Sequence, residues 1–156
     1  MSRRKFLTML AGLACAAAVC GPPLAQAQAP KGGSPAEARA MLERAVQALR
    51  ADKQKALTAF TQATKDFRHG DLYVFCFGPD GTVDAHPNAA LIGVKASQLK
   101  DKDGKAFALE ILQVAQPGTF AEVTYSWPRL LSNDPMRKTS YVTRIDDHVC
   151  GVGYYN

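Results

Sequence analysis

The sequence predicts an α+β domain in which an N-terminal helix packs on one antiparallel sheet. Apolar residues first recur with helical spacing between Ala38 and Phe67, and then run without interruption from Leu72 to Phe77. Beyond residue 105 come a short helical segment and three strand-like segments separated by turns. A helix followed by strands is typical of an α+β plan rather than of alternating strands and helices. The sequence contains no internal repeat and indicates no second domain.

The first expected element is a helix that begins with its own capping residues. Ser34 suits the N-cap, Glu37 can close a capping box, and Pro35 stands where a missing N–H costs nothing. A polar run that starts at Asp52 interrupts the apolar stripe. The pattern therefore allows either one long helix or two helices joined near this residue, with the end at His69-Gly70.

The strands are expected where the apolar period changes from helical to extended. Leu72 to Phe77 is six apolar residues in a row, which is typical of a strand buried on both faces. A Gly-Pro-Asp-Gly turn at 78–81 follows it. The connection at 88–105 is long enough to suggest a function, because long ordered loops usually have one. The other expected elements are a strand at 82–86, a helix at 106–116, and strands at 120–127, 139–145 and 148–155.

The first 27 residues have the order of a secretory signal peptide: a charged start, an uncharged apolar run, and small residues before a cleavage site. The start, Ser2-Arg3-Arg4-Lys5-Phe6-Leu7, matches a twin-arginine signal, and an ordinary Sec signal with two chance arginines is the alternative. A lipoprotein signal would need Cys15 or Cys20, and the residues before both are poor for it. The apolar run is too short to span a bilayer.

We therefore expect residues 1–27 to be removed, 28–33 to form a disordered leader, and 34–156 to fold as a single periplasmic domain. Removal leaves 129 of the 156 residues, which is enough for one core. It also removes three basic residues, so 16 of the 19 remain against 14 acidic ones, a net charge of +2. The mature chain then has no basic run that would indicate a nucleic-acid partner and no membrane span.

Two cysteines remain after that cleavage, Cys76 and Cys150. An even number in an oxidising compartment favours a disulfide, and two buried free thiols are the alternative. Neither Cys-x-x-Cys nor Cys-x-x-Cys-His occurs, so nothing indicates a thioredoxin-like site or a c-type haem. The three histidines show no metal-ligand spacing with cysteines or carboxylates, and we expect no metal and no cofactor.

Short motifs between residues 67 and 155 follow one another in a recognisable order. They are Asp71-Leu72-Tyr73-Val74-Phe75, Asp80-Gly81-Thr82-Val83-Asp84-Ala85-His86-Pro87-Asn88, Leu91-Ile92-Gly93, Asp103-Gly104-Lys105, Tyr125-Ser126-Trp127-Pro128, Lys138-Thr139-Ser140-Tyr141-Val142 and Gly151-Val152-Gly153-Tyr154. Together they resemble the single Cache domain of the second type, an extracytoplasmic sensor module related in shape to PAS domains. The helix before them also suits that family.

The resemblance implies a five-stranded antiparallel sheet with strand order 2-1-5-4-3, in which the strands that carry Cys76 and Cys150 are neighbours. It also implies a pocket for a small molecule, often a carboxylate, between the sheet and the long loop with its short helix. Family members usually form the periplasmic part of chemoreceptors or histidine kinases. Because this sequence shows no transmembrane helix after its last strand, we expect it to act through a partner: a membrane sensor kinase, a chemoreceptor or a transporter.

The family motif points to Lys138 as the charge partner of a small organic acid, and a solvated lysine at the start of a strand is the alternative. Trp127 and Tyr125 lie two residues apart and share a sheet face, so they can wall a pocket or simply pack. Tyr141 can offer a hydroxyl beside Lys138, and we rank it above Ser140, which points to the opposite face from Tyr141.

Two further residues are each open to two interpretations. His86, at the end of a strand, is either a ligand contact or the cap of a turn, and Arg129 is either a second cation of the site or simply exposed. The aromatic face of the strand at 72–77 is expected to be structural packing, with Gly151 and Gly153 on the neighbouring strand leaving room for its rings.

Capture of a small acid is therefore the expected function, and two other classes of protein remain as alternatives. A structural or interaction protein would fill the same cavity with its own side chains. A small isomerase-like enzyme would need an acid–base residue in the cavity. The carboxylates of this sequence fall mostly in turns and no catalytic motif occurs, so we do not expect an enzyme.

We predict that the exported protein begins at Gln28, because Ala25-Gln26-Ala27 supplies the small residues that a signal peptidase reads. N-terminal sequencing of the exported protein checks this, and a lipid-modified cysteine at the new terminus would contradict it. Replacing Arg3 and Arg4 by lysine should block export if the twin-arginine route is used. Normal export of that variant would favour the Sec route instead.

Overall fold

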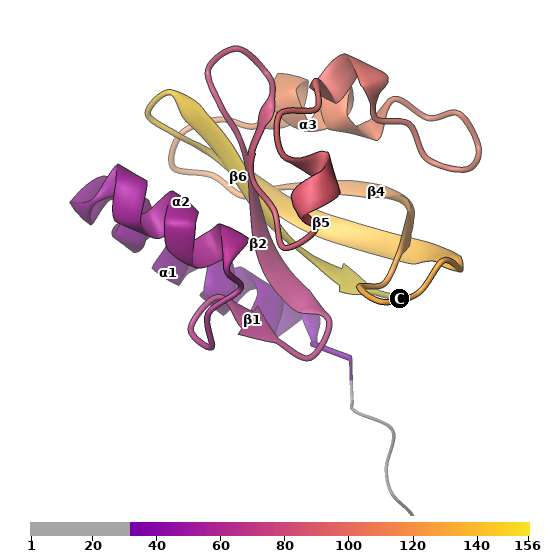
Figure 1. Cartoon of the computed structure of the whole chain (residues 1–156), viewed down its shortest axis with the longest axis horizontal. Helices are drawn as coiled ribbons and strands as arrows, with labels where there is room; N and C mark the ends of the chain where they lie inside the picture. The colour runs from indigo at the N-terminus through magenta and orange to yellow at the C-terminus, as the bar shows by residue number, and fades with distance from the viewer. Residues whose placement is uncertain (1–31) are drawn as a thin grey trace, which may run out of the picture.

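The structure is a computed structural model that describes residues 32–156 (Figure 1). The expected signal peptide at 1–27, its twin-arginine motif and most of the leader at 28–33 lie outside the described residues. Gly33, at the end of that leader, is buried and donates its N–H to Oδ1 of Asp71 at 2.7 Å. None of the described helices combines the length and the apolar composition that crossing a bilayer requires.

Two helices open the domain, α1 at Pro35–Ala51 and α2 at Lys53–Thr61. The expected capping box is present, because the N–H of Glu37 donates to Ser34 Oγ and the N–H of Ser34 donates to the Glu37 carboxylate. The chain thus forms two helices rather than one, and the polar run in the apolar stripe marks their joint.

Asp52 produces the joint because it caps both helices. Its backbone is extended, with φ −157° and ψ 98°, which ends α1. Its N–H still bonds to the carbonyl of Ala48 in α1, while its carboxylate accepts the N–H of Lys55 at 3.0 Å and so starts α2.

The helical region ends at Thr61, earlier than the expected end at His69-Gly70. Phe67 continued the apolar stripe in the sequence, but it lies outside the helix. The chain turns back through Ala63, which has a φ of +49°, and the Phe67 ring meets the Phe60 ring edge-on at 4.7 Å. The apolar stripe therefore predicted correctly that Phe67 packs with the helices, but it predicted the helix to be longer than it is.

Six strands form the antiparallel sheet (Figure 1). Neighbouring strands follow the path β1-β2-β6-β5-β4, and β3 also pairs with β2. The strands are β1 Arg68–His69, β2 Leu72–Phe77, β3 Val83–Ala85, β4 Ala121–Pro128, β5 Pro135–Ile145 and β6 His148–Tyr155. Between β3 and β4 lie two 3₁₀ turns, η1 Ala89–Leu91 and η2 Ala96–Gln98, and the helix α3 Phe107–Val114.

The strand order differs in one detail from the predicted order 2-1-5-4-3, which corresponds to β3-β2-β6-β5-β4. Those pairings are present, but the sheet has six strands rather than five. The additional strand, β1, has two residues and pairs with the start of β2 on the edge that β3 occupies farther along. Two exposed residues carry no apolar period, so the sequence pattern could not reveal this strand.

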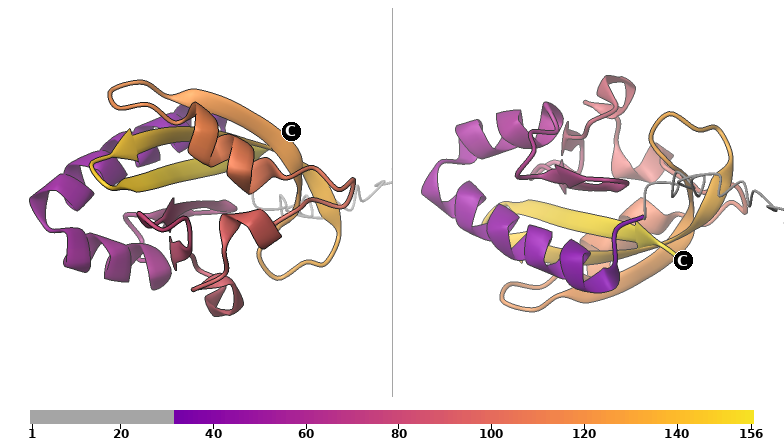
Figure 2. Two further views of the ribbon diagram at one scale, coloured as in Figure 1. Left: turned by 90° about the horizontal axis from the view of Figure 1, so that it is seen from above. Right: turned by 90° about the horizontal axis from the view of Figure 1, so that it is seen from below.

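Both faces of the sheet are covered (Figure 2): α1 and α2 lie on one side, and the long connection with α3 lies on the other. β2 divides its side chains between these layers. Its even-numbered residues from Leu72 to Cys76 pack with the helices, whereas its odd-numbered residues from Tyr73 to Phe77 pack on the α3 side. This confirms the prediction of a strand buried on both faces.

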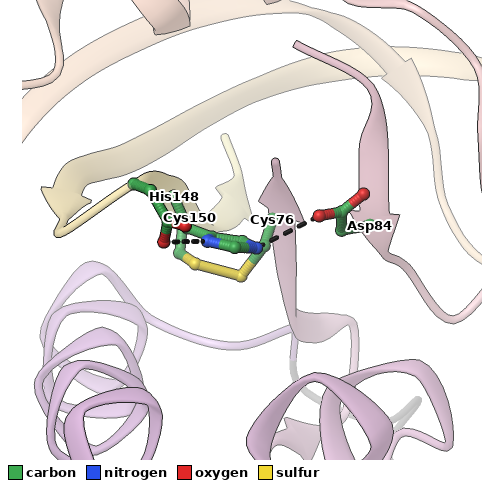
Figure 3. The surroundings of a disulfide bond; sticks show 5 residues. Cys76, Asp84, His148 and Cys150 are labelled. Atoms are coloured by element: carbon green, nitrogen blue, oxygen red, sulfur yellow. Dashed lines mark hydrogen bonds and ion pairs between the residues drawn. A yellow bond between two sulfur atoms is a disulfide. The ribbon is translucent and has the colours of Figure 1, made fainter. Parts of the chain in front are cut away.

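A disulfide joins Cys76 of β2 to Cys150 of β6 (Figure 3), which confirms the predicted pairing. The two residues are directly opposite in the strand register, and both are fully buried on the helix side. His148 lies beside the disulfide, with Nδ1 2.7 Å from Asp147 and Nε2 3.1 Å from Asp84. The centre of the sheet is therefore locked both covalently and through this polar bridge.

We predict that replacing Cys76 and Cys150 together by alanine lowers the free energy of unfolding by about 2–4 kcal/mol. The reason is that the bond restricts an unfolded loop closed across a sequence separation of 74 residues. Urea unfolding of the mature protein measures the difference, and thiol counting on the unfolded, non-reduced parent should find no reactive thiol. Two reactive thiols in the parent would contradict the pairing.

Candidate functional site

A small cavity lies on the α3 side of the sheet, and we call it the inner cavity. Its volume is about 30 Å³, room for roughly two water molecules. Its walls are mostly aromatic rings and aliphatic side chains from β2, β4, α3 and the long connection. The lining residues that carry polar groups are Tyr73, Tyr125, His86 and Trp127.

Lys138 provides the charge beside the inner cavity. Only 1 % of its surface is exposed, and its Nζ donates to the hydroxyl of Tyr73 at 2.8 Å. The same nitrogen lies 4.0 Å from the centre of the Tyr73 ring and 5.1 Å from that of Tyr155, distances at which aromatic rings attract a cation. Because Tyr73 lines the cavity, the lysine charge is one hydrogen bond away from it.

The strand register explains why Lys138 is buried. β5 begins at Pro135, four residues earlier than predicted, so Lys138 lies inside the strand, opposite Tyr155 of β6 and Tyr125 of β4. Gly153 of β6 leaves the space for its stem, because a Cβ at that glycine would collide with Cε of Lys138. The alternative of a solvated lysine at a strand end is therefore wrong.

The charge of Lys138 has little compensation inside the protein. Burial lowers the pKa of Lys138 to about 7, and the carboxylate of Asp71 opposes this only in part. Among residues 32–156, no carboxylate lies within ion-pair distance of its Nζ, and one hydrogen bond, to Tyr73, is formed. An ammonium has three donors. A buried cation with two unused donors beside a cavity is suited to an anionic ligand.

His86 faces the same region as a neutral ring. Its Nδ1 accepts the N–H of Asn88 at 2.9 Å, so it caps the turn, as one of its two interpretations proposed. Burial, together with the nearby charge of Lys138, lowers the pKa of His86 to about 3. With Nδ1 acting as acceptor, the proton is on Nε2, which stays available as a donor. His86 also lines the cavity, with its ring 5.0 Å from that of Tyr73.

Tyr125 and Trp127 form one wall of the cavity together with Phe107 of α3. The Tyr125 ring stacks on Phe107 with 4.1 Å between centroids, and the Trp127 ring meets Phe107 edge-on at 5.0 Å. The Tyr125 hydroxyl shares a 2.9 Å hydrogen bond with Ser140, and burial raises its pKa. The predicted common face of Tyr125 and Trp127 is confirmed, and both line the cavity.

Tyr141 is not beside Lys138, which corrects the ranking made from the sequence. It packs on the helix side of the sheet, with its ring 5.8 Å from that of Tyr154. Ser140, ranked lower, has the side that faces the site and bonds to Tyr125. The physical reason is the two-residue period of a strand: 138 and 140 share one face, and 141 lies on the other.

Sequence reasoning missed the site roles of Tyr73, Tyr155 and Phe107. Tyr73 had been assigned to structural packing, because an aromatic face on a central strand normally packs. Gly151 does leave room for Phe75, as expected, but Gly153 leaves room for Lys138 rather than for a β2 ring. The two glycines of β6, Gly151 and Gly153, were the sequence signal that could have indicated a buried Lys138.

A larger pocket lies outside the inner cavity, and we call it the outer pocket. Its volume is about 600 Å³, and it is walled by Arg68 of β1, the start of the long connection, and residues 127–133. His86, Leu91 and Trp127 line both spaces and therefore form the boundary between them.

In the part of the chain that the structure describes, the titratable groups around His148, outside this region, have structural partners. Over residues 32–156, no three His, Cys, Asp or Glu side chains come together in a way that could hold a metal ion. His148 is held between Asp84 and Asp147, and Asp147 is also paired with Lys53 at 2.9 Å. The Lys53 and His148 contacts lower the pKa of Asp147 to about 2.

Comparison with known proteins gives the class of protein that this fold and site define. Residues 37–155 match the dCache_2 family, described as a Cache domain, and the chain therefore belongs to the Cache domain family. No curated protein matches the sequence. Cache domains are extracytoplasmic sensor domains, so the resemblance stated from the motifs is confirmed at the level of the family.

The similar solved structures include sensor domains of chemotaxis proteins. A methyl-accepting chemotaxis protein from Vibrio parahaemolyticus RIMD 2210633 is 25 % identical with a TM-score of 0.63, over 77 % of this chain and 86 % of that chain. A periplasmic sensor domain of a chemotaxis protein is 25 % identical with a TM-score of 0.60, over 77 % and 88 %. A Cache chemosensory domain solved for its recognition of carboxylic acid shares the fold at 24 % identity and a TM-score of 0.56, over 77 % and 86 %.

We predict that Lys138 makes the stability of the ligand-free domain depend on pH. Its pKa is about 7 when folded against an ordinary value of 10.5, so between these values the unfolded chain holds the extra proton. The cost of burying the charge is therefore complete below pH 7, and stability rises by about 1 kcal/mol per pH unit as the pH increases from 7 towards 10.

Urea unfolding of the parent and of Lys138→Met between pH 6 and pH 10 isolates the effect from other titrating groups. The variant should have its greatest advantage in stability near pH 6, and the advantage should shrink as the pH rises. A difference between the two proteins that does not change with pH would show that Lys138 is not buried as an ammonium.

Proposed function

We propose that this protein is an extracytoplasmic sensor domain that binds a small organic acid and acts through a partner protein of the membrane, such as a chemoreceptor, a sensor kinase or a transporter. The observation that supports it most is Lys138, a fully buried cation with unused donors next to a cavity. Such a group gains most from an anion that replaces the hydration lost on burial.

The inner cavity combines polar groups with aromatic walls, which suits the carboxylate end of an organic acid and the carbons next to it. A carboxylate next to Lys138 would receive charge-assisted hydrogen bonds from the ammonium and one from the Tyr73 hydroxyl, which already accepts from Lys138. The neutral His86 adds a donor without adding a charge. The rings of Phe107 and Trp127 would cover the carbons next to that carboxylate and exclude water.

The relatives support the same class of function. The similar structures at 25 % identity are a methyl-accepting chemotaxis protein and a periplasmic sensor domain of a chemotaxis protein. The third shares only the fold, and its recognition of carboxylic acid guides the choice of compounds to test. Sensor domains of this kind bind ligands rather than catalyse reactions, and none of the site residues described above is arranged as a nucleophile with a base.

One observation favours the alternative of an interaction protein with a self-filled cavity. The inner cavity has only about 30 Å³ of free volume, because the ring of Phe107 stacks closely on Tyr125. In that case the Lys138–Tyr73 pair would be a structural element of the core. The two functions differ in whether any acid binds to the mature protein.

We predict that calorimetry of the mature protein with acids of two to six carbons finds at least one ligand. The binding free energy of a small ligand is at most about 1.5 kcal/mol per heavy atom. A ligand of about five or six heavy atoms therefore binds with no more than about −9 kcal/mol, so micromolar to millimolar dissociation constants are expected. Lys138→Met should weaken binding roughly 10- to 150-fold, the value of one charge-assisted hydrogen bond.

Lys65→Met serves as the matched control, because Lys65 is exposed and does not line the inner cavity. It should bind as tightly as the parent. If no acid binds, or if Lys138→Met binds as tightly as the parent while remaining folded, the acid site is wrong and the self-filled cavity becomes the better description.

A further inference from the structure

The outer pocket is basic, whereas the inner cavity is mostly apolar. Arg68 and Arg129 line it, and none of its lining residues is acidic. Its volume of about 600 Å³ lies within the range of small-molecule sites. Because His86, Leu91 and Trp127 line both spaces, a ligand in the inner cavity is a direct neighbour of this basic pocket.

Two cations, Lys138 and Arg129, contact the same aromatic ring, which limits the distance between their charged groups. The ring centre of Tyr155 lies 5.1 Å from Nζ of Lys138 and 5.2 Å from Cζ of Arg129. Adding the two distances shows that the two charged groups are at most 10.3 Å apart. Tyr155 is held by the pairing of β6 with β5 and by its hydroxyl, which donates to the carbonyl of Pro128 at 2.7 Å. The spacing is therefore built into the sheet.

Arg129 is positioned by its neighbours but keeps its binding groups free. Its Nε lies 3.3 Å from Oδ2 of Asp71, yet neither atom has an aligned hydrogen bond within the described chain. In the same residues, no hydrogen bond involves Nη1 or Nη2 of Arg129, the fork that binds carboxylates, although the guanidinium as a whole is ion-paired with Asp71. About 40 % of the side chain is exposed, so a ligand in the outer pocket can reach it.

The inner cavity is too small to hold a whole acid. A volume of about 30 Å³ suits one carboxylate end, and a carbon chain must extend across the boundary into the outer pocket. In a diacid of four or five carbons the carboxyl carbons are roughly 4–5 Å apart. With roughly 3–4 Å from each carboxyl carbon to its cation, such a molecule spans the distance of up to 10.3 Å between Lys138 and Arg129.

We propose that the ligand is a dicarboxylic acid of about four or five carbons, with one carboxylate at Lys138 and Tyr73 and the other at the guanidinium fork of Arg129. This rests on the proposed function, since Lys138 must hold the first carboxylate. Arg129 is then the residue that distinguishes diacids from monoacids, because a monoacid leaves the fork without a partner.

Calorimetry with succinate, glutarate and butyrate tests the proposal on the mature protein. The parent should bind one of the two diacids at least about tenfold more tightly than butyrate, which has the chain length of succinate but one carboxylate. Arg129→Gln should weaken diacid binding roughly 10- to 100-fold and leave butyrate binding within about twofold of the parent. Lys138→Met should weaken both classes.

Arg50→Gln, an exposed arginine of α1 outside both pockets, is the matched control and should change none of the affinities. Unchanged butyrate binding also shows that Arg129→Gln remains folded, and Arg129→Lys should recover part of the diacid affinity. If Arg129→Gln weakens both classes equally or neither of them, the two-ended site is wrong while the acid site at Lys138 stands. If neither diacid binds while another acid of two to six carbons does, the diacid proposal is wrong and the acid site at Lys138 stands; if no acid of that panel binds, the acid site itself is wrong.

Discussion

The burial of one ammonium group, that of Lys138, is the constraint around which the α3 side of the domain is arranged. A charge removed from water is costly unless other groups replace its hydration. Here the replacement consists of the Tyr73 hydroxyl and the ring faces of Tyr73 and Tyr155. Gly153 is small because the lysine stem passes over it. A protein that retains such a group without a carboxylate partner would gain stability from an anion that supplied one.

The two faces of the sheet differ in what they hold: the packed helices lie on one, and the cavity with Lys138 lies on the other. On the helix side, apolar packing and the Cys76–Cys150 disulfide hold β2 and β6 in register. On the other side, the pairing of β5 with β6 decides which residues of β5 face the cavity. A slip of β5 by one residue would turn Lys138 towards the helices and Tyr141 towards the cavity.

The amino-acid sequence by itself determined the features that depend on neighbouring residues. The capping residues at the start of α1, the change from helical to extended period, and the burial of β2 on both faces are all local patterns, and all were predicted. The family motifs added the Cache fold, the pairing of Cys76 with Cys150 and the choice of Lys138. The two-residue period also placed Tyr125 and Trp127 together, although the same rule was not carried through to Ser140.

The tertiary structure alone decided the features that depend on residues far apart in the sequence. Whether Lys138 is solvated or buried is settled by Gly153 and Tyr155 across a strand pair, and no local pattern reports that pairing. The separation into an inner cavity and an outer pocket arises where the long connection meets the end of β4. The approach of Arg129 to the ring that Lys138 also contacts follows from the same packing. Periodicity assigns a side chain to a face, but only the packing of separate segments determines what it meets there.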